Sequence, residues 1–349
     1  MKRNMIRLAA ILRGAPIAVL LVLVVALDLR AEEKVLEIGK WYPTAEIGVT
    51  LSQSTFSDNW AGGDKGSVVW TGIVNASLES QLRKEVNWSN VLKLAYGQMH
   101  QQSADENGDR FWQKPAKSTD LIDYETIFRF TFNGFIDPYL SGRFESQFQD
   151  ASDAGGRTLS LNPMRFKESA GIARKFINEE ERSLLTRLGF TFRQNKRRLF
   201  EAPTGDGTVS HTTNDGGIEF LADYKAKIFS ERVTWTSKFT AYQPVFYSKS
   251  EVFDDLTPAQ YEAAGLDPDV GDFAKTVDLD WENIFTSQIT KVISVNLYLR
   301  WVYDKYDNSV PPALTETGDL ANPGDVKAAI RKAGQLKETL ALGLTYRLL

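Results

Sequence analysis

The stretch Asp120–Phe148, DLIDYETIFRFTFNGFIDPYLSGRFESQF, decides the fold of this chain. Between Ile122 and Phe132, every second position is apolar or aromatic except Thr126, and mostly polar side chains occupy the positions between them. A period of two indicates a β-strand with one apolar face. The pattern returns after the turn-forming residues Asn133–Pro138, so the stretch predicts a hairpin of two strands.

Both predicted strands are long, and phenylalanine dominates their apolar face. Strands of soluble sheets average about 5 or 6 residues, whereas a tilted strand needs about 9 to 11 residues to cross a bilayer. The hairpin therefore predicts an all-β fold, an antiparallel up-and-down transmembrane β-barrel with its aromatic face toward lipid.

The same alternation recurs along the rest of the chain. It marks further strands near residues 47–51, 68–78, 86–97, 166–176, 184–192, 218–228, 233–239, 277–285, 293–303 and 340–348. With the hairpin, these segments predict about 12 strands. Long and short connections alternate, which is typical of a barrel with long extracellular loops and short periplasmic turns. The later long loops are predicted at residues 195–216, 243–274 and 304–334, with a short helix from Thr257 to Gly265.

The N-terminal segment has the layout of a secretory signal peptide. Basic residues precede an apolar run from Ala15 to Leu27, and the small residue Ala31 follows. We therefore expect a signal peptide at residues 1–31, a short periplasmic segment at 32–43 and the barrel at 44–349, with an uncleaved anchor as the alternative. The expected location is integral to a bacterial (Gram-negative) outer membrane.

Charge and composition limit the partners and cofactors. The 349-residue chain has a formal net charge of −4, and basic residues are dispersed among acidic ones, which argues against a nucleic-acid partner. The chain has no cysteine, so neither disulfides nor lipoprotein processing are available. No phosphate loop, cysteine metal site or other cofactor motif is found. The expected partners are outer-membrane lipid and a small hydrophilic solute.

The C-terminal strand adds one further partner. Leu340–Leu348 is apolar at every second position and resembles the signal by which outer-membrane barrels are recognised for assembly, although the chain ends on leucine where aromatic residues are usual. The resemblance implies the barrel-assembly machinery as a partner during biogenesis.

The polar faces of the predicted strands carry the candidate site. Positive and negative side chains are interspersed there, so they predict a polar lumen without strong ion selectivity. The candidates are Lys93, Asp123, Glu125, Arg129, Arg143, Glu145, Lys175, Arg187, Glu219, Asp223, Lys225, Lys227, Lys238, Asp278, Asp280, Glu282 and Arg300. A twelve-strand barrel lies between side-chain-filled barrels of about 8 strands and open ones of about 16, so strand count does not decide whether the lumen is open.

A motif in the first long loop carries a family resemblance. Asn59, Trp60, Gly62 and Gly63 form Asn-Trp-x-x-Gly-Gly, in which the tryptophan either caps the barrel mouth or packs in a tight turn. With further short matches at Trp88–Asn90, Lys117–Asp120 and Gln335–Glu338, the chain resembles an uncharacterised outer-membrane barrel family of Bacteroidota-type bacteria, a domain of unknown function with this motif. The resemblance covers most of residues 40–349 and implies fold and location, but no activity.

Three functions are open at this point. The sequence favours a porin-like pore or channel for small hydrophilic solutes. The first alternative is a closed-lumen barrel that acts as a structural, adhesive or receptor platform through its loops. A lipid-modifying enzyme ranks last and we expect no enzyme, because His211 lies in a predicted polar loop without a serine at strand spacing. Acidic loop clusters such as Asp267, Asp269 and Asp272 are interpreted as turns rather than calcium sites.

Overall fold

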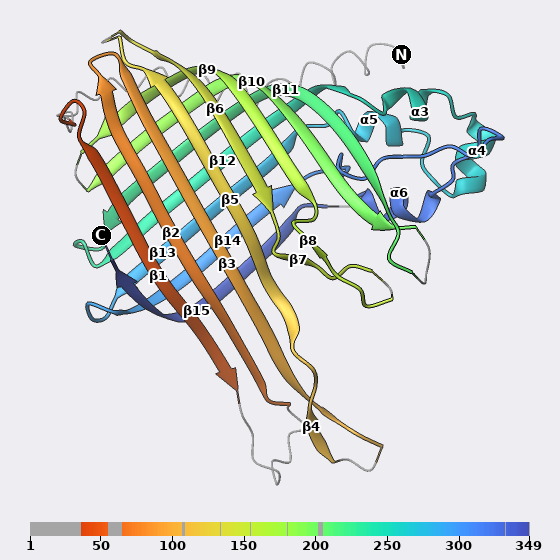
Figure 1. The fold of residues 1–349 in the computed structure, drawn as a ribbon, viewed down its shortest axis with the longest axis horizontal. Helices are drawn as coiled ribbons and strands as arrows, with labels where there is room; N and C mark the ends of the chain where they lie inside the picture. The colour runs from red at the N-terminus through yellow and green to blue at the C-terminus, as the bar shows by residue number, and fades with distance from the viewer. Residues whose placement is uncertain are drawn as a thin grey trace, which may run out of the picture.

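Twelve antiparallel strands close into a barrel (Figure 1). The structure, a computed structural model, describes residues 36–54, 65–106, 109–132, 134–153, 155–179, 181–201, 205–331 and 333–348. The strands follow one another around the wall in chain order, β1 pairs with β15, and β2 pairs with β3, so the sheet closes. The predicted up-and-down barrel of about 12 strands is therefore confirmed.

The barrel strands vary in length from 10 to 21 residues. Their bounds are β1 Trp41–Ser54, β2 Ser67–Arg83, β3 Val86–Ala104, β5 Ala116–Phe130, β6 Asp137–Ser146, β9 Met164–Asn178, β10 Arg182–Phe200, β11 Thr208–Ile228, β12 Val233–Tyr247, β13 Asp278–Gln288, β14 Ile293–Tyr303 and β15 Gln335–Arg347. Three short strands, β4 Arg110–Trp112, β7 Gln149–Asp150 and β8 Leu159–Ser160, lie in the long loops.

The predicted hairpin forms from β5 and β6, with Phe128 opposite Leu140. β5 ends at Phe130 and β6 ends at Ser146, each earlier than expected, whereas β5 begins earlier than expected, at Ala116. The reason at the outer end is Asp120, whose carboxylate accepts hydrogen bonds from the backbone N–H groups of Phe148 (2.7 Å) and Gln149 (3.0 Å). Those N–H groups bind a side chain instead of the ladder, so the strand stops before Phe148.

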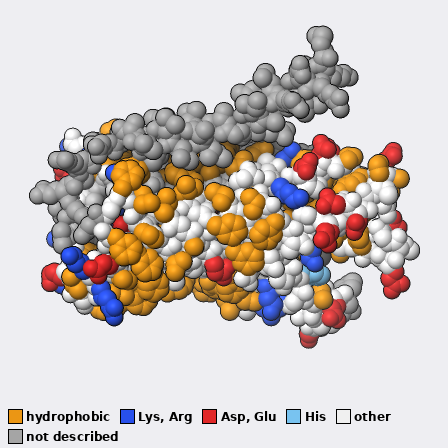
Figure 2. All heavy atoms as spheres, turned by 90° about the horizontal axis from the view of Figure 1, so that it is seen from above, with side chains coloured by type: hydrophobic (Ala, Val, Ile, Leu, Met, Phe, Trp, Pro, Cys, Tyr) orange, Lys and Arg blue, Asp and Glu red, His pale blue; other side chains and the backbone are white. Residues whose placement is uncertain are grey.

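The barrel inverts the usual distribution of polar and apolar side chains. Large hydrophobic side chains such as Phe190, Leu340 and Leu344 are exposed on the outer wall, and polar ones such as Asp123, Arg187 and Glu219 are buried. Figure 2 shows hydrophobic side chains gathered over the barrel wall, with charged side chains mostly toward the two ends. Outward rings also stack near the strand ends, as Trp88 does on Phe128 with centroids 5.3 Å apart. Such a surface fits contact with lipid rather than water.

The predicted loop at residues 195–216 is wrong. Strands β10 and β11 stay paired up to Phe200 and Thr208, so His211 lies on a strand, opposite Arg197. The prediction failed because both faces of this hairpin extension are polar. Beyond the lipid-facing part of the wall, no apolar face is needed, and the period of two disappears from the hydrophobicity although the backbone ladder continues. Strand β12 likewise runs to Tyr247, past the predicted loop start at residue 243.

Two loops pack together at one end of the barrel into a small helical unit, here called the cap (residues 248–277 and 304–331; Figure 1). Its helices are α3 Ser250–Asp254, α4 Pro258–Ala264, α5 Val270–Phe273 and α6 Pro323–Ala329. Phe253, Val270, Tyr306 and Val326 are almost fully buried and form its apolar core, together with Tyr247 at the end of β12. The predicted helix over residues 257–265 is present as α4, with Thr257 in a capping box and Gly265 in the left-handed conformation.

Within these described residues, no helix is long and apolar enough to cross a membrane.

Candidate functional site

The register of the ladder places the predicted polar residues on one face of the sheet. Lys93 lies opposite Asp123, Glu125 opposite Arg143, and Glu282 opposite Arg300. This face is the interior, because ion pairs on it join strands that are not neighbours. The candidates that the ladder brings to this face are Lys93, Asp123, Glu125, Arg129, Arg143, Glu145, Glu219, Asp223, Lys225, Lys227, Asp278, Asp280, Glu282 and Arg300.

Three strands meet in the ion-pair cluster around Glu125. The carboxylate of Glu125 on β5 lies 2.8 Å from Nη1 of Arg187 on β10 and 4.0 Å from Nζ of Lys238 on β12. The side chains of Arg187 and Glu125 are only 5% and 16% exposed. Removal of water strengthens the attraction between these charges, so the cluster ties distant parts of the wall together.

The neighbouring charges on this side of the interior are paired as well. Arg143 donates to both oxygens of Asp123, at 2.7 and 3.0 Å, and lies 3.5 Å from Glu145. Lys167 on β9 forms an ion pair with Glu219 on β11. Bidentate guanidinium–carboxylate contacts have fixed geometry, so these side chains form an ordered network rather than mobile charges.

A second cluster, around Arg193, lies nearer the cap. Nε of Arg193 is 2.6 Å from Asp215, and Nη1 is 3.0 Å from Asp278 on β13. The hydroxyl of Tyr242 donates to the same Asp215 oxygen at 2.6 Å, and its ring lies 3.8 Å from the guanidinium. Asp215 is completely buried. One arginine therefore compensates two carboxylates from different strands.

Part of this network was not predicted from the sequence. Lys167, Arg193 and Asp215 were not among the candidates, because they fall at the margins of predicted strands or in the mispredicted loop at 195–216. The available signal was the apolar face formed by Phe166, Ala170 and Ile172, because Lys167 occupies an alternate position and therefore points inward.

A hydrogen bond ties the cap to the barrel mouth: Nε2 of Gln243 on β12 donates to the carbonyl of Lys275 at 2.7 Å. Within the cap, Nδ2 of Asn308 donates to the carbonyl of Ala274 at 3.0 Å and joins the two loops. Arg331 lies 3.7 Å from Asp307, also within the cap. Although burial opposes it, the Arg165 guanidinium on the inner face of β9 lowers the pKa of Asp307. The charge of Asp307, in the segment after β14, thus interacts with a charge on β9.

The cap should be more stable at mildly acidic pH. Burial, and then the nearby charge of Asp307, raise the pKa of Asp304 to about 6, against the opposing charges of Arg193 and Arg331. An aspartate raised in this way contributes stability below its ordinary pKa, and this contribution is lost as the pH rises through about 6. Amide hydrogen exchange across residues 306–310, corrected for intrinsic rates, should therefore be slower at about pH 5 than at about pH 7.5.

The Asp304→Asn variant is the control for this effect, because it cannot titrate and should remove most of the pH dependence. Measurements should stay above about pH 4.5, since Asp307 has a lowered pKa and loses its own stabilising charge in more acidic solution. Equal protection at both pH values in the unaltered chain would contradict the assignment to Asp304.

The opposite wall of the interior is open to solvent. Thr339 on β15, Asn75 on β2 and Thr44 on β1 face inward and are exposed, and so is Lys337. By contrast, the inward residues Asp123, Ser169, Thr191 and Glu219 on the side of β5–β11 are buried. The charged network therefore occupies one side of the lumen and leaves a polar, hydroxyl-bearing wall on the other.

The loop motif Asn59, Trp60, Gly62 and Gly63 and the predicted signal peptide lie outside the described residues. In the part of the chain that the structure does describe, no three His, Cys, Asp or Glu side chains form a group that could hold a metal ion. Asp267, from the acidic loop near α5, accepts a hydrogen bond from the backbone N–H of Asp269 at 2.9 Å, as in a turn.

The fold and its interior define the class as closed twelve-strand antiparallel barrels, the architecture of outer-membrane proteins. Residues 51–151 match the family model described as "Protein of unknown function (DUF3078)". Comparison with curated proteins gives no match.

Several solved barrels are similar in fold. An outer membrane channel from Pseudomonas putida F1 is 9% identical, with a TM-score of 0.38, over 90% of this chain and 97% of the channel. The translocator domain of the autotransporter NalP from Neisseria meningitidis is 9% identical, with a TM-score of 0.35, over 89% of this chain and 90% of that domain. The NanC porin is 8% identical, with a TM-score of 0.33, over 87% of this chain and 100% of the porin. Likeness at these identities concerns the fold alone.

Proposed function

We propose that this protein is an integral barrel of a bacterial outer membrane that passes small hydrophilic solutes through its lumen. The observation that supports the proposal is the exposed inward wall, on which Thr339, Asn75 and Lys337 meet solvent while the charged network lies against the other side. A passage lined by hydroxyl, amide and charged groups favours hydrated molecules over apolar ones.

The direct test is conductance in a planar bilayer. The protein purified from membranes and shown to be folded should give discrete current steps after insertion. If protein shown to be inserted gave no current steps, this result would contradict an open lumen.

Substitution in the exposed wall sharpens this test. Thr339→Trp should lower the single-channel conductance, because it adds a large side chain at an inward position that is now solvent-exposed. Leu340→Trp is the matched control, because Leu340 is next to Thr339 on the same strand but is exposed on the outer wall. Equal conductance of the two variants would mean that ions do not pass along this wall.

The cap supports a second candidate, a closed barrel that binds partners through its loops. Its buried core of Phe253, Val270, Tyr306 and Val326 makes the cap a packed unit rather than a set of mobile loops. A packed loop unit can present a fixed surface. If the protein inserted in the bilayer but gave no current, the result would favour a closed barrel that binds partners over the pore.

A further inference from the structure

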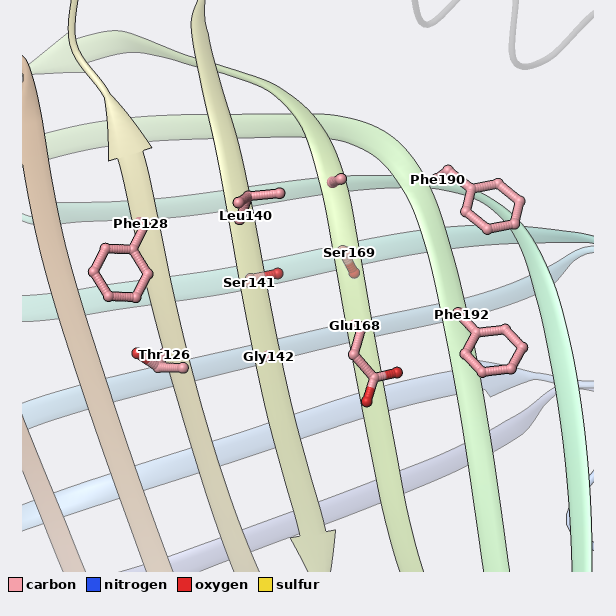
Figure 3. A pocket seen from close by; sticks show the side chains of 10 residues that line it. Thr126, Phe128, Leu140, Ser141, Gly142, Glu168, Ser169, Phe190 and Phe192 are labelled. Atoms are coloured by element: carbon pink, nitrogen blue, oxygen red, sulfur yellow. The ribbon is translucent and has the colours of Figure 1, made fainter.

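A groove of about 440 Å³ crosses the outer face of β5, β6, β9 and β10. Figure 3 shows Phe128 on one side of it, Phe190 and Phe192 on the other, and Glu168 between them. The groove exists because two small residues, Gly142 and Ala170, stand among the aromatic side chains of this face. Gly142 lies opposite Glu168, and Ala170 lies opposite Phe190.

These residues are on the lipid-facing side of the sheet. Glu168 is opposite Gly142, whereas its neighbour Lys167 is opposite the inward-facing Arg143. Since successive residues of a strand point to opposite faces, Glu168 points outward. The rings of Phe144 and Phe166, 5.2 Å apart, lie one step further along the same face toward the loop end. The Glu168 carboxylate therefore lies next to a pair of aromatic rings, on the side away from the loops.

The charge of Glu168 has no partner among the residues that the structure describes. None of them donates a hydrogen bond to its carboxylate or forms an ion pair with it, and the side chain is exposed. Acidic side chains on the lipid-facing side of a barrel are unfavourable, more so with depth. A cation from the surroundings would satisfy the carboxylate.

A second copy of this chain is a poor source of that cation. Two barrels in one membrane are related by a two-fold axis along the membrane normal, so a dimer through this groove would bring Glu168 near its own counterpart. Arg174, on the same face of β9, is held at the other end of the strand by the carbonyl of Phe135 at 2.9 Å. The charges disfavour such a dimer.

We propose that this groove binds a membrane lipid with a primary ammonium headgroup. The acyl chain lies along the apolar floor between Phe128 and Phe190, and the ammonium N–H groups donate to the carboxylate of Glu168. A primary ammonium supplies both the charge and the donors for a charge-assisted hydrogen bond, whereas a quaternary ammonium has no N–H group and an anionic headgroup is repelled. The inference depends on insertion of the barrel in a membrane, but not on an open lumen.

Native mass spectrometry of the detergent-solubilised protein tests this assignment. Phosphatidylethanolamine, phosphatidylcholine and phosphatidylglycerol with identical acyl chains are titrated separately. We expect the unaltered protein to bind phosphatidylethanolamine about ten-fold more tightly than phosphatidylcholine, and phosphatidylglycerol most weakly. This comparison needs no substitution, so it does not depend on the folding of a variant.

Three variants locate the site. Glu168→Gln should lose the preference for phosphatidylethanolamine, and Gly142→Leu should weaken binding of both zwitterionic lipids by filling the groove. A Cβ at Gly142 would meet only the Thr126 methyl group, at 3.7 Å, so the backbone tolerates this change. Glu338→Gln is the matched control, because Glu338 is an exposed carboxylate on the outer face of β15 and does not line the groove.

Equal affinity of the unaltered protein for the three lipids would overturn the proposal, as would unchanged preference in Glu168→Gln. A dimer that forms without lipid and dissociates in Gly142→Leu would assign the groove to a second copy instead. Each result is independent of conductance, so failure here can be told apart from failure of the pore proposal.

Discussion

Replacing Glu125 with glutamine is expected to lower the free energy of unfolding of the barrel by about 3–5 kcal/mol. The change leaves Arg187, which is 5% exposed, without its carboxylate partner and removes the nearest acidic group of Lys238. An uncompensated buried charge costs far more than the pair contributes, because water no longer solvates it. Denaturant unfolding of the refolded protein in lipid vesicles measures the loss.

The control is Asp280→Asn, which breaks a carboxylate–guanidinium pair with equally good geometry. Arg300 donates to both oxygens of Asp280 at 2.9 and 2.7 Å, but the two side chains are 43% and 39% exposed. Solvent screens this pair, so the expected loss is only about 0–1 kcal/mol. A similar loss of unfolding free energy in both variants would show that the interior around Glu125 is as accessible to solvent as the opposite wall.

Glu125→Gln should also change ion selectivity if the lumen conducts. The substitution leaves the positive charges of Arg187 and Lys238 unopposed at the centre of the network, so the reversal potential in a salt gradient should shift toward anions. An unchanged reversal potential in a conducting, correctly folded variant would place the ion path away from this cluster.

Arg193→Met is expected to destabilise the protein by about 3–5 kcal/mol, and to loosen the cap. The substitution removes the cation that compensates both Asp215 and Asp278. Asp215 is fully buried, and its Oδ2 atom already has no hydrogen-bond partner among the described residues. Because Asp278 is the first residue of β13 after the cap, hydrogen exchange in α5 should accelerate as well.

The triple variant Arg193→Met, Asp215→Asn and Asp278→Asn should recover much of this loss, since no buried charge then remains unpaired. Arg182→Met is the matched control: this arginine binds both oxygens of Glu179 at 3.1 and 3.0 Å but is 44% exposed. Its expected cost is about 0–1 kcal/mol. A triple variant as unstable as Arg193→Met alone would assign the loss to packing rather than charge.

The strands that face lipid could be predicted from the sequence, because each has one apolar face. Strand β14 was predicted at residues 293–303 and occupies those residues, with Leu297, Leu299 and Trp301 on the outer face. The hairpin extension of β10 and β11 was not readable, because water surrounds it and either face can be polar. The helix α4 was predicted from its local capping residues, Thr257 and Gly265, which need no tertiary information.

By itself, the sequence determined the barrel, its strand number and the inward direction of its charges, because these follow from a local period of two. Only the tertiary structure decided which charges meet. Glu125 pairs with Arg187 and Lys238, residues far along the chain that closure of the sheet brings across the lumen. Likewise, the exposure of Thr339 and the hollow beside Glu168 depend on which side chains fill the neighbouring strands, and the alternation within one strand carries no information about that filling.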